Sequence, residues 1–259
     1  MKGPRLDAWL VEHGFAETRA RAQALVLAGK VRIGDKRADK AGLAVPEGAD
    51  VAVDSDDGWA SRGAHKLLGA IAAFPALAAR IPGARALDVG ASTGGFSDVL
   101  LRHGAAHVIA LDVGWGQLHE RLRQDPRVTV LDRTNIRLLP AGALAYAPDL
   151  AVCDASFISV RLFLDVVFRE LAAGGLFCVL VKPQFEVGKD KVGKGGVVRD
   201  DALRVEALEA VIAAATAVGF VARGHAESPL AGPAGNREWL LLLEKPAAAS
   251  PPVPDRIDG

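Results

Sequence analysis

The most constraining feature of the sequence is the stretch from Ala86 to Phe96, which reads ALDVGASTGGF. A short apolar run containing Asp88 breaks into glycine and other small residues, and a helical pattern then runs from Phe96 to Leu101. This order predicts a buried parallel strand, a tight turn and a helix whose first N–H groups face the turn. Glycines let a ligand approach the backbone closely, and free helix N–H groups can hold an anion. The stretch therefore predicts a nucleotide-like ligand here, the alternative being an ordinary glycine-rich loop.

Strand and helix patterns alternate along the chain from residue 84 onward, which is typical of a doubly wound parallel sheet. Strands are predicted at residues 85–89, 107–111, 128–131, 149–152, 176–181 and 239–243, and a long helix at 200–218. The predicted fold class is therefore α/β, with a Rossmann-like domain over residues 62–246.

Acidic residues follow three consecutive predicted strands, at Asp112, Asp132 and Asp154. One aspartate after a strand is commonly just a helix cap. In open α/β sheets, however, ligands bind at the carboxyl ends of the strands, where all three residues are expected. A carboxylate at Asp112 also suits the two hydroxyl donors of a ribose. Three such residues together favour a ligand crevice.

The first 54 residues show a different pattern and are predicted to form a small α+β unit. Apolar spacing predicts a first helix that ends at Gly14 and a second from about Thr18 to Ala28, and short strands are predicted at 31–33 and 51–53. Basic residues gather in this unit, where they predict an RNA-binding surface or, equally well, a solvated face. The candidate RNA contacts are Arg5, Arg19, Arg21, Lys30 and Arg32.

Two segments interrupt these patterns. A polar run from Asp54 to Gly58 separates the small unit from the larger one, so residues 55–61 are the predicted linker. From Pro246 the sequence is rich in alanine and proline, and residues 247–259 are predicted to be a flexible tail.

Composition limits the remaining classes of protein. The 259 residues carry no formal net charge, so a nucleic-acid contact has to come from local patches. The two cysteines, Cys153 and Cys178, fall in predicted buried strands without metal-ligand spacing, so we expect them to pack in the core and expect no metal. No signal peptide and no apolar run long enough to span a bilayer is evident, which predicts a cytoplasmic protein without a membrane partner.

Four charged residues lie next to predicted strands of the sheet or before its first strand. Lys66 precedes the first strand of the sheet, Asp154 and Lys182 follow the fourth and fifth strands, and Glu238 opens the last strand. Taken alone, Lys66 beside an apolar pair is typical of a lysine at the edge of an amphipathic helix. In this topology all four residues can meet in one crevice.

The chain resembles known families in two regions. The helix–helix–hairpin order and the basic residues of the first fifty residues resemble the S4-type RNA-binding domain. The set Lys66, Asp154, Lys182 and Glu238, with the turn at 90–95, resembles the FtsJ-like ribose 2′-O-methyltransferases. With the S4-type unit in front, the chain is similar to the TlyA family of rRNA methyltransferases, also labelled hemolysin A. The matching motifs are SRGAHKL at 61–67, GASTGGF at 90–96, CDASFIS at 153–159, VKPQFEVG at 181–188 and GNRE at 235–238.

The resemblance implies a reaction and a role for each of the four residues. The expected reaction is methyl transfer from S-adenosyl-L-methionine to a ribose 2′-hydroxyl, without a metal, on cytidine of ribosomal RNA in the ribosomal subunits. Lys182 would accept the hydroxyl proton, and Lys66 would favour the neutral form of Lys182 and hold the ribose or a phosphate. Asp154 and Glu238 would orient the two lysines, although carboxylates also favour the charged form of a lysine.

The resemblance also implies a cofactor site at the glycine-rich turn. The turn would take the methionine moiety, Asp112 the ribose diol and Asp132 the adenine amino group. The full expected set of cofactor-binding residues is Asp88, Gly90, Ala91, Ser92, Thr93, Gly94, Gly95, Phe96, Asp112 and Asp132.

Other classes of protein remain open from the sequence. An NAD-dependent oxidoreductase would also use Asp112, but the glycines lack the G-x-G-x-x-G spacing. A membrane-acting hemolysin is the class that the older family label suggests, but no strongly basic amphipathic helix is evident. A catalytically inactive RNA-binding protein would be favoured by loss of any of the four charged residues, and all four are present.

Overall fold

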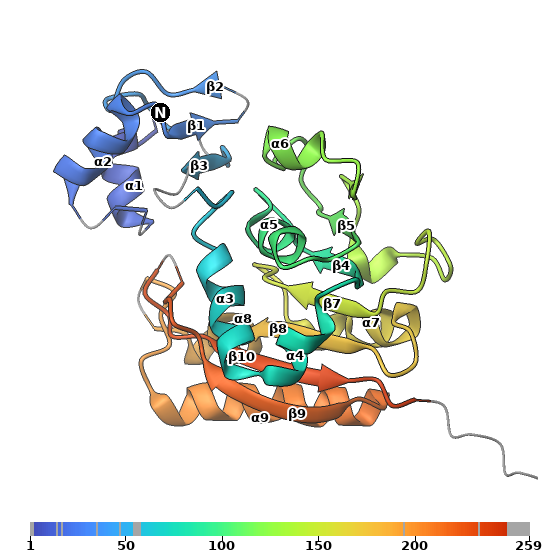
Figure 1. The fold of residues 1–259 in the computed structure, drawn as a ribbon. Coiled ribbons are helices and arrows are strands. Elements are labelled where there is room, and N and C mark those ends of the chain that lie inside the picture. Colours follow the sequence, from blue (N-terminus) through green and yellow to red (C-terminus); the bar gives the residue numbers. More distant parts are fainter. Residues whose placement is uncertain are drawn as a thin grey trace, which may run out of the picture.

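The computed structural model describes residues 3–13, 15–16, 18–34, 36–46, 48–53, 58–193, 195–232 and 234–247 (Figure 1). The predicted helix end at Gly14, most of the polar run before Gly58 and nearly all of the predicted tail lie outside these ranges.

The N-terminal unit consists of two helices packed on a small antiparallel sheet. Its elements are α1 (Leu6–Glu12), α2 (Arg19–Leu27), β1 (Val31–Ile33), β2 (Lys36–Arg37) and β3 (Val51–Val53), and the strand order is β2-β1-β3. The Thr18 hydroxyl caps α2 by accepting the Arg21 N–H at 3.2 Å. Leu6, Leu10 and Val31 are fully buried in the core of this unit. The apolar spacing that predicts the helices thus supplies the core that holds them together.

The larger unit is built on a sheet for which the described residues supply seven strands. The strands are β4 (Arg85–Val89), β5 (His107–Leu111), β6 (Val128–Leu131), β7 (Leu150–Cys153), β8 (Leu176–Val181), β9 (Val221–Glu227) and β10 (Trp239–Glu244). The order is β6-β5-β4-β7-β8-β10-β9. Strands β4 to β8 pair in parallel, whereas β10 is antiparallel to both β8 and β9. The α/β prediction is confirmed, but the expectation of a wholly parallel sheet is wrong at this edge, and strand β9 is not predicted from the sequence.

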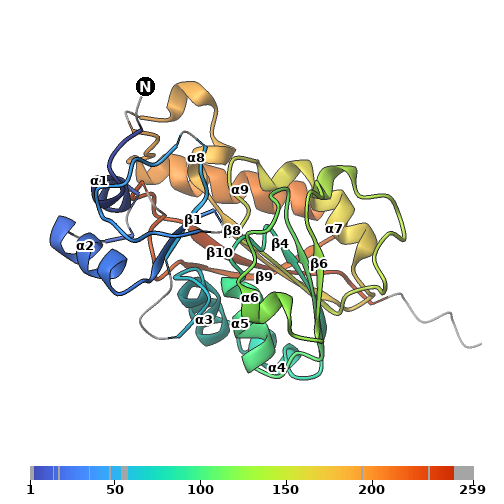
Figure 2. The same cartoon turned by 90° about the horizontal axis from the view of Figure 1, so that it is seen from above.

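Helices cover both faces of the sheet, as Figure 2 shows. The helices are α3 (Ala64–Ala73), α4 (Pro75–Arg80), α5 (Gly95–Arg102), α6 (Glu120–Arg123), α7 (Leu164–Glu170), α8 (Pro183–Glu186) and α9 (Asp201–Val218), with short 3-10 turns η1 (Ile136–Leu138), η2 (Val160–Leu162) and η3 (Lys189–Lys191). Alternate residues of one strand face opposite layers: Val152 packs with α3 and α5, and Ala151 packs with α7 and α9. The continuous apolar runs in β7 and β8 reflect burial on both faces.

The chain reverses direction across the sheet between β4 and β7. From β4 it proceeds outward through β5 to β6, and it then returns to the other side of β4 for β7 and β8. Such a topological switch point leaves a crevice at the carboxyl ends of the two central strands, where open α/β sheets bind ligands. The glycine-rich turn follows β4, and Asp154 follows β7. The fold therefore brings both sequence features to this crevice.

Candidate active site

The four charged residues reach the crevice from four different elements. Lys66 lies in α3, Asp154 directly follows β7, and Lys182 directly follows β8. Strand β10 runs antiparallel to β8 and pairs Trp239 with Val181. The start of β10 therefore lies beside the end of β8, so the antiparallel edge carries Glu238 to the same end of the sheet as Lys182.

The side chains form a continuous chain of ion pairs. Lys66 Nζ lies 2.8 Å from Glu238 Oε2 and 3.2 Å from Asp154 Oδ2. Lys182 Nζ lies 2.7 Å from Asp154 Oδ1. The Lys66, Lys182 and Glu238 side chains are buried, and 21% of the Asp154 side chain is exposed. The structure thus brings the four predicted residues together, with Asp154 shared between the two lysines, and Lys66 is not an edge lysine.

The pairing keeps the central groups charged despite their burial. Burial lowers the pKa of Lys66, but the attraction of Asp154 and Glu238 outweighs it, so this pKa lies above its ordinary value. Burial raises the pKa of Asp154, but the charges and hydrogen bonds of Lys182 and Lys66 outweigh it, so this pKa lies below its ordinary value. We therefore describe Lys66 as a cation and Asp154 as a carboxylate.

Lys182 has three oxygen partners. Its Nζ contacts Asp154 Oδ1, the Asp154 carbonyl oxygen at 3.1 Å and the Ser156 hydroxyl at 2.7 Å. A lysine ammonium has three N–H donors and no acceptor, so these three oxygens suit its charged form. Ser156 is a site residue that we did not predict from the sequence; its position within the motif at 153–159 is the signal that could have indicated it.

The glycine-rich turn packs closely against the residues that follow β7. Gly90 has φ +77°, and a Cβ atom there would lie 3.0 Å from Ala155 Cα, so only glycine suits this turn. Asp88 accepts hydrogen bonds from the Ser97 N–H and hydroxyl through Oδ2, whereas Oδ1 is buried without a partner among the described residues. A buried acceptor without a donor fits the ammonium group of a methionine moiety.

Asp112 and Asp132 shape the loops that follow β5 and β6. Asp112 accepts the Ser92 N–H at 2.8 Å and the Gly114 N–H at 2.7 Å. Asp132 accepts the Gly116 N–H and pairs with Arg123 at 3.0 Å. A carboxylate has about four lone-pair sites, so both residues keep capacity for a ligand donor. Their predicted contacts with a ribose and an adenine stay predictions.

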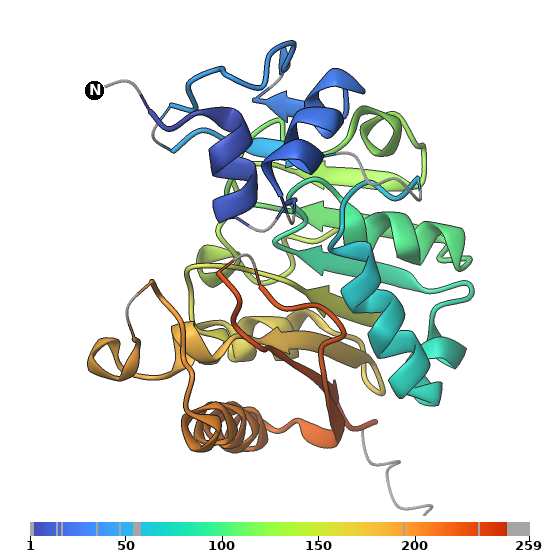
Figure 3. The ribbon, with the colours of Figure 1, turned by 90° about the vertical axis from the view of Figure 1, so that its left-hand side faces the viewer.

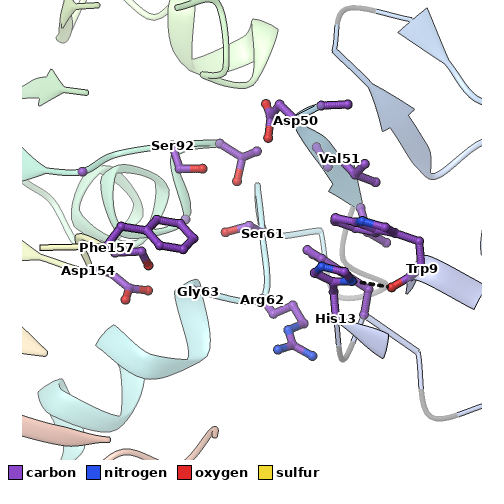
Figure 4. Close-up of a pocket in the computed structure, with 18 of the residues that line it drawn as sticks. Trp9, His13, Asp50, Val51, Ser61, Arg62, Gly63, Ser92, Asp154 and Phe157 are labelled. Carbon is purple, nitrogen blue, oxygen red and sulfur yellow. Dashed lines mark hydrogen bonds between the residues drawn. The ribbon is translucent and has the colours of Figure 1, made fainter. Parts of the chain in front are cut away.

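A cavity of about 1000 Å³ is lined by Lys66, Asp154 and Lys182 of the larger unit and by residues of the N-terminal unit. In Figure 4, Asp154 and Phe157 lie on one side of it, and Trp9 and His13 of the N-terminal unit lie on the other. The Trp9 and His13 rings stack with centroids 3.8 Å apart. Figure 3 shows the N-terminal unit against one end of the larger unit. A ligand that reaches Lys182 through this cavity therefore meets both units.

Phe157 is an exposed aromatic side chain on the wall of the cavity. It is 92% exposed and has φ +64°, a left-handed conformation that is rare for a bulky residue. Its ring centroid lies 5.6 Å from that of Phe185. We did not predict a role for Phe157 from the sequence, because its exposure follows from the backbone conformation.

The predicted RNA contacts of the N-terminal unit include a pair of arginines held by one aspartate. Asp7 is 1% exposed and accepts two hydrogen bonds from Arg5, at 3.1 Å and 3.0 Å. Arg19 approaches the same carboxylate at 3.6 Å. The hydrogen bond from Arg5 holds the pKa of Asp7 well below its ordinary value. Both guanidinium groups remain more than half exposed and accessible to phosphate.

The other candidate contacts are spread over α2 and β1. Arg21 is an exposed residue of α2, Lys30 lies at the exit of that helix, and Arg32 lies in β1. Arg32 pairs with Arg37 of β2, so that edge carries two guanidinium groups on adjacent strands. The five candidates therefore do not form one compact cluster around Asp7.

Three further expectations concern the cysteines, a metal site and a membrane span. Cys153 and Cys178 are free and buried, as predicted, and burial raises the pKa of each thiol to about 12. Among the described residues, no group of three or more His, Cys, Asp or Glu side chains is arranged to hold a metal ion. In the same part of the chain, none of the helices has the length and apolar character needed to span a membrane.

The mixed sheet with a crevice at its switch point gives the fold class as α/β, and the comparison with known families gives the class of enzyme, a methyltransferase. Residues 59–245 match the FtsJ-like methyltransferases, and residues 4–51 match the S4 domain. The chain belongs to the FtsJ-like methyltransferase family and carries an S4 domain in front of the matching region.

Relatives and solved structures agree with this assignment over most of the chain. The 16S/23S rRNA (cytidine-2'-O)-methyltransferase TlyA of Mycobacterium tuberculosis is 49% identical over 92% of this chain and 89% of its own length. Hemolysin A of Brachyspira hyodysenteriae is 35% identical over 91% of this chain and 98% of its own length. The solved structure of a hemolysin homologue from Streptococcus thermophilus aligns with a TM-score of 0.78 and 37% identity, over 98% of this chain and 93% of the other.

The burial of Asp88 makes the stability of the fold depend on pH. Burial raises its pKa to about 7, although the Ser97 hydrogen bonds act in the opposite direction. Because the unfolded chain releases this proton near the ordinary value and the folded chain holds it to about pH 7, the free energy of unfolding falls as pH rises between these values. The isosteric Asp88→Asn has no proton to lose, so we expect it to be more stable than wild type at pH 8, by about 4 kcal/mol at most.

Urea unfolding of both proteins from pH 4 to pH 8 measures this difference. Other titrating groups are common to the two proteins and cancel in the comparison. A stability difference that is the same at pH 4 and pH 8 would show that Asp88 is not held protonated in the fold.

Proposed function

We propose that this protein transfers a methyl group from S-adenosyl-L-methionine to the ribose 2′-hydroxyl of cytidine in ribosomal RNA. The observation that carries the proposal is the convergence of Lys66, Asp154, Lys182 and Glu238 beside the glycine-rich turn. The M. tuberculosis relative, whose name gives this reaction, supports it. A ribosomal substrate implies that the enzyme works in the cytoplasm.

The cofactor would supply an electrophilic methyl group on a sulfonium. We propose that the turn from Gly90 to Phe96 holds its methionine moiety, with Asp88 Oδ1 as the partner of the ammonium group. Asp112 would bind the ribose hydroxyls, and Asp132 the adenine amino group. The position of the turn on the wall of the cavity and the buried, unpaired oxygen of Asp88 support this assignment.

Lys182 is the proposed general base. A ribose hydroxyl is hardly ionised at neutral pH, so a base that removes its proton during attack lowers the barrier. In the structure the Lys182 Nζ contacts three oxygens. A charged ammonium has no lone pair, so it cannot accept a proton. We propose that Lys182 first loses a proton to solvent and then accepts the hydroxyl proton at Nζ.

Lys66 and Glu238 act on Lys182 through Asp154. Lys66 remains a cation and shares the Asp154 carboxylate with Lys182. Glu238 holds Lys66 in place at 2.8 Å. We propose that this arrangement holds Lys182 Nζ in place for the ribose hydroxyl and leaves Lys66 able to attract a phosphate.

The cavity suits an RNA nucleotide brought to Lys182 from the side of the S4 domain. Single-stranded RNA is commonly recognised by stacking of its bases on aromatic side chains. Phe157, exposed beside Asp154, offers such a surface. We propose that the target base packs on Phe157 while the S4 domain, over residues 1–54, binds the surrounding RNA. The polar residues from 55 to 61 would connect the two domains.

The test is methyl transfer from tritiated S-adenosyl-L-methionine to purified ribosomal subunits and to ribosomes. We expect label at a ribose, resistant to alkaline hydrolysis at the modified nucleotide, on cytidine of at least one subunit. No transfer to any subunit, although the protein binds the cofactor, would contradict the proposed substrate and favour the inactive RNA-binding alternative.

A second prediction concerns the S4 domain. Replacing Arg19 and Arg21 with glutamine should weaken RNA binding and lower the slope of log affinity against log salt by about two, since each lost phosphate contact removes about one from the slope. Filter binding at several salt concentrations measures this slope.

The control for this experiment is the pair Arg80→Gln and Arg223→Gln, which belong to α4 and β9. Figure 1 shows these two elements away from the N-terminal unit. The control should keep the wild-type slope. An unchanged slope in the Arg19 and Arg21 variant would show that these residues do not contact phosphate.

A further inference from the structure

The loop that follows β7 carries three features of the site in a strained conformation. Asp154, Ser156 and Phe157 lie within four residues, outside any helix or strand. The left-handed conformation of Phe157 is unfavourable for a bulky side chain and persists only where surrounding contacts fix the backbone. The loop therefore needs anchors on both sides of Phe157.

The first anchor is the contact with Lys182 that precedes Phe157. The Ser156 hydroxyl lies 2.7 Å from Lys182 Nζ. This contact fixes the loop to the end of β8, one residue before Phe157.

The second anchor is a single carboxylate, that of Glu186, after Phe157. Glu186 Oε2 accepts the Ser159 hydroxyl at 2.6 Å, and Oε1 accepts the Val160 N–H at 2.7 Å. The Arg161 guanidinium donates to Oε2 at 3.1 Å and to the Glu186 carbonyl oxygen at 2.9 Å. Three consecutive residues, the last of the loop and the first two of η2, thus bind one side chain.

Burial makes this second anchor sensitive to substitution. The Glu186 side chain is 1% exposed, so water does not replace a lost partner without cost. The Val160 N–H is buried at the same contact. Loss of the carboxylate would leave buried donors unpaired.

Both anchors belong to one short piece of chain. Helix α8 begins at Pro183, directly after Lys182, and ends at Glu186. Phe185 of the same helix lies against Phe157, with the ring centroids 5.6 Å apart. The proposed base, the support of the aromatic ring and the carboxylate anchor therefore lie within five consecutive residues, 182–186.

We propose that Glu186 is a positioning residue of this methyltransferase: its buried carboxylate fastens residues 159–161 to α8 and so sets Ser156 and Phe157 in place relative to Lys182. Glu186 does not line the cavity and acts only through these residues. The inference rests on the proposed function, because it assigns to Phe157 and Lys182 their roles toward the RNA nucleotide.

The test compares Glu186→Gln with Glu170→Gln. Glutamine keeps the size of the side chain but has one acceptor oxygen, so it cannot satisfy Ser159, Val160 and Arg161 together. Glu170 is also a buried glutamate paired with the preceding arginine, at 2.8 Å, but it ends α7, before the start of β8, whereas Glu186 follows the end of that strand. The two variants therefore remove similar buried charges, one of them remote from the site.

Single-turnover methylation of ribosomal subunits gives the main measurement. For Glu186→Gln we expect the rate at saturating RNA to fall by about tenfold or more and the KM for RNA to rise, since even small misplacement of reacting groups lowers the rate strongly. Cofactor affinity should stay within about twofold, because the cofactor does not depend on Phe157. Glu170→Gln should keep the wild-type rate and KM.

Hydrogen–deuterium exchange provides a measurement that does not depend on the substrate. Exchange over residues 155–163 should accelerate in Glu186→Gln and remain at the wild-type level in Glu170→Gln. If wild type itself methylates no subunit, the proposed function fails, and exchange alone decides whether Glu186 holds the loop.

Two results would overturn the inference. One is unchanged exchange over residues 155–163 in Glu186→Gln. The other is a rate and KM equal to those of Glu170→Gln at equal loss of stability in urea, which would make Glu186 a purely structural residue.

Discussion

The architecture of the site depends on one buried interaction, the sharing of the Asp154 carboxylate by two lysines. Lys66 and Lys182 approach its two oxygens, and Glu238 supplies the charge that balances Lys66. Removing one partner from a buried ion pair typically costs about 3–5 kcal/mol, because the remaining charge stays buried. The fold therefore has to deliver all four side chains to one place, and each of them constrains the element that carries it.

The topology of the sheet explains how four distant parts of the sequence meet. The switch between β4 and β7 opens the crevice, and parallel pairing places Asp154 and Lys182 at neighbouring strand ends. The antiparallel strand β10 is essential to this arrangement, since a parallel strand in its place would start beside the amino end of β8 and carry Glu238 away from Lys182. The departure from a wholly parallel sheet is thus part of the site. Hydrogen bonds also hold the site together, because Glu186 of α8 fastens the loop that follows β7.

Local sequence patterns predict much of the sheet and part of the site. The predicted strands at 85–89, 107–111, 128–131 and 176–181 coincide with the observed ones, because each is a short, mainly apolar run. Strand β9 escaped prediction, because its mostly exposed residues show no apolar alternation and its neighbour β10 organises it. Phe157 and Glu186 also escaped, since a positive φ and a contact across 26 positions leave no local pattern. Asp132 was recognised by position, but its pairing with Arg123 depends on tertiary structure.

The most direct test of the proposed mechanism is the single-turnover rate of Lys182→Ala on a methyl-accepting ribosomal subunit, with cofactor affinity measured on the same protein. General base catalysis contributes about 10²–10⁴-fold, so the rate should fall by about this factor while cofactor affinity stays close to wild type. Lys191→Ala, which removes an exposed lysine paired with Glu206, should retain the wild-type rate. A Lys182→Ala protein that methylates RNA at nearly the wild-type rate would contradict the assignment of Lys182 as the base and, with it, the catalytic role of the buried ion pairs.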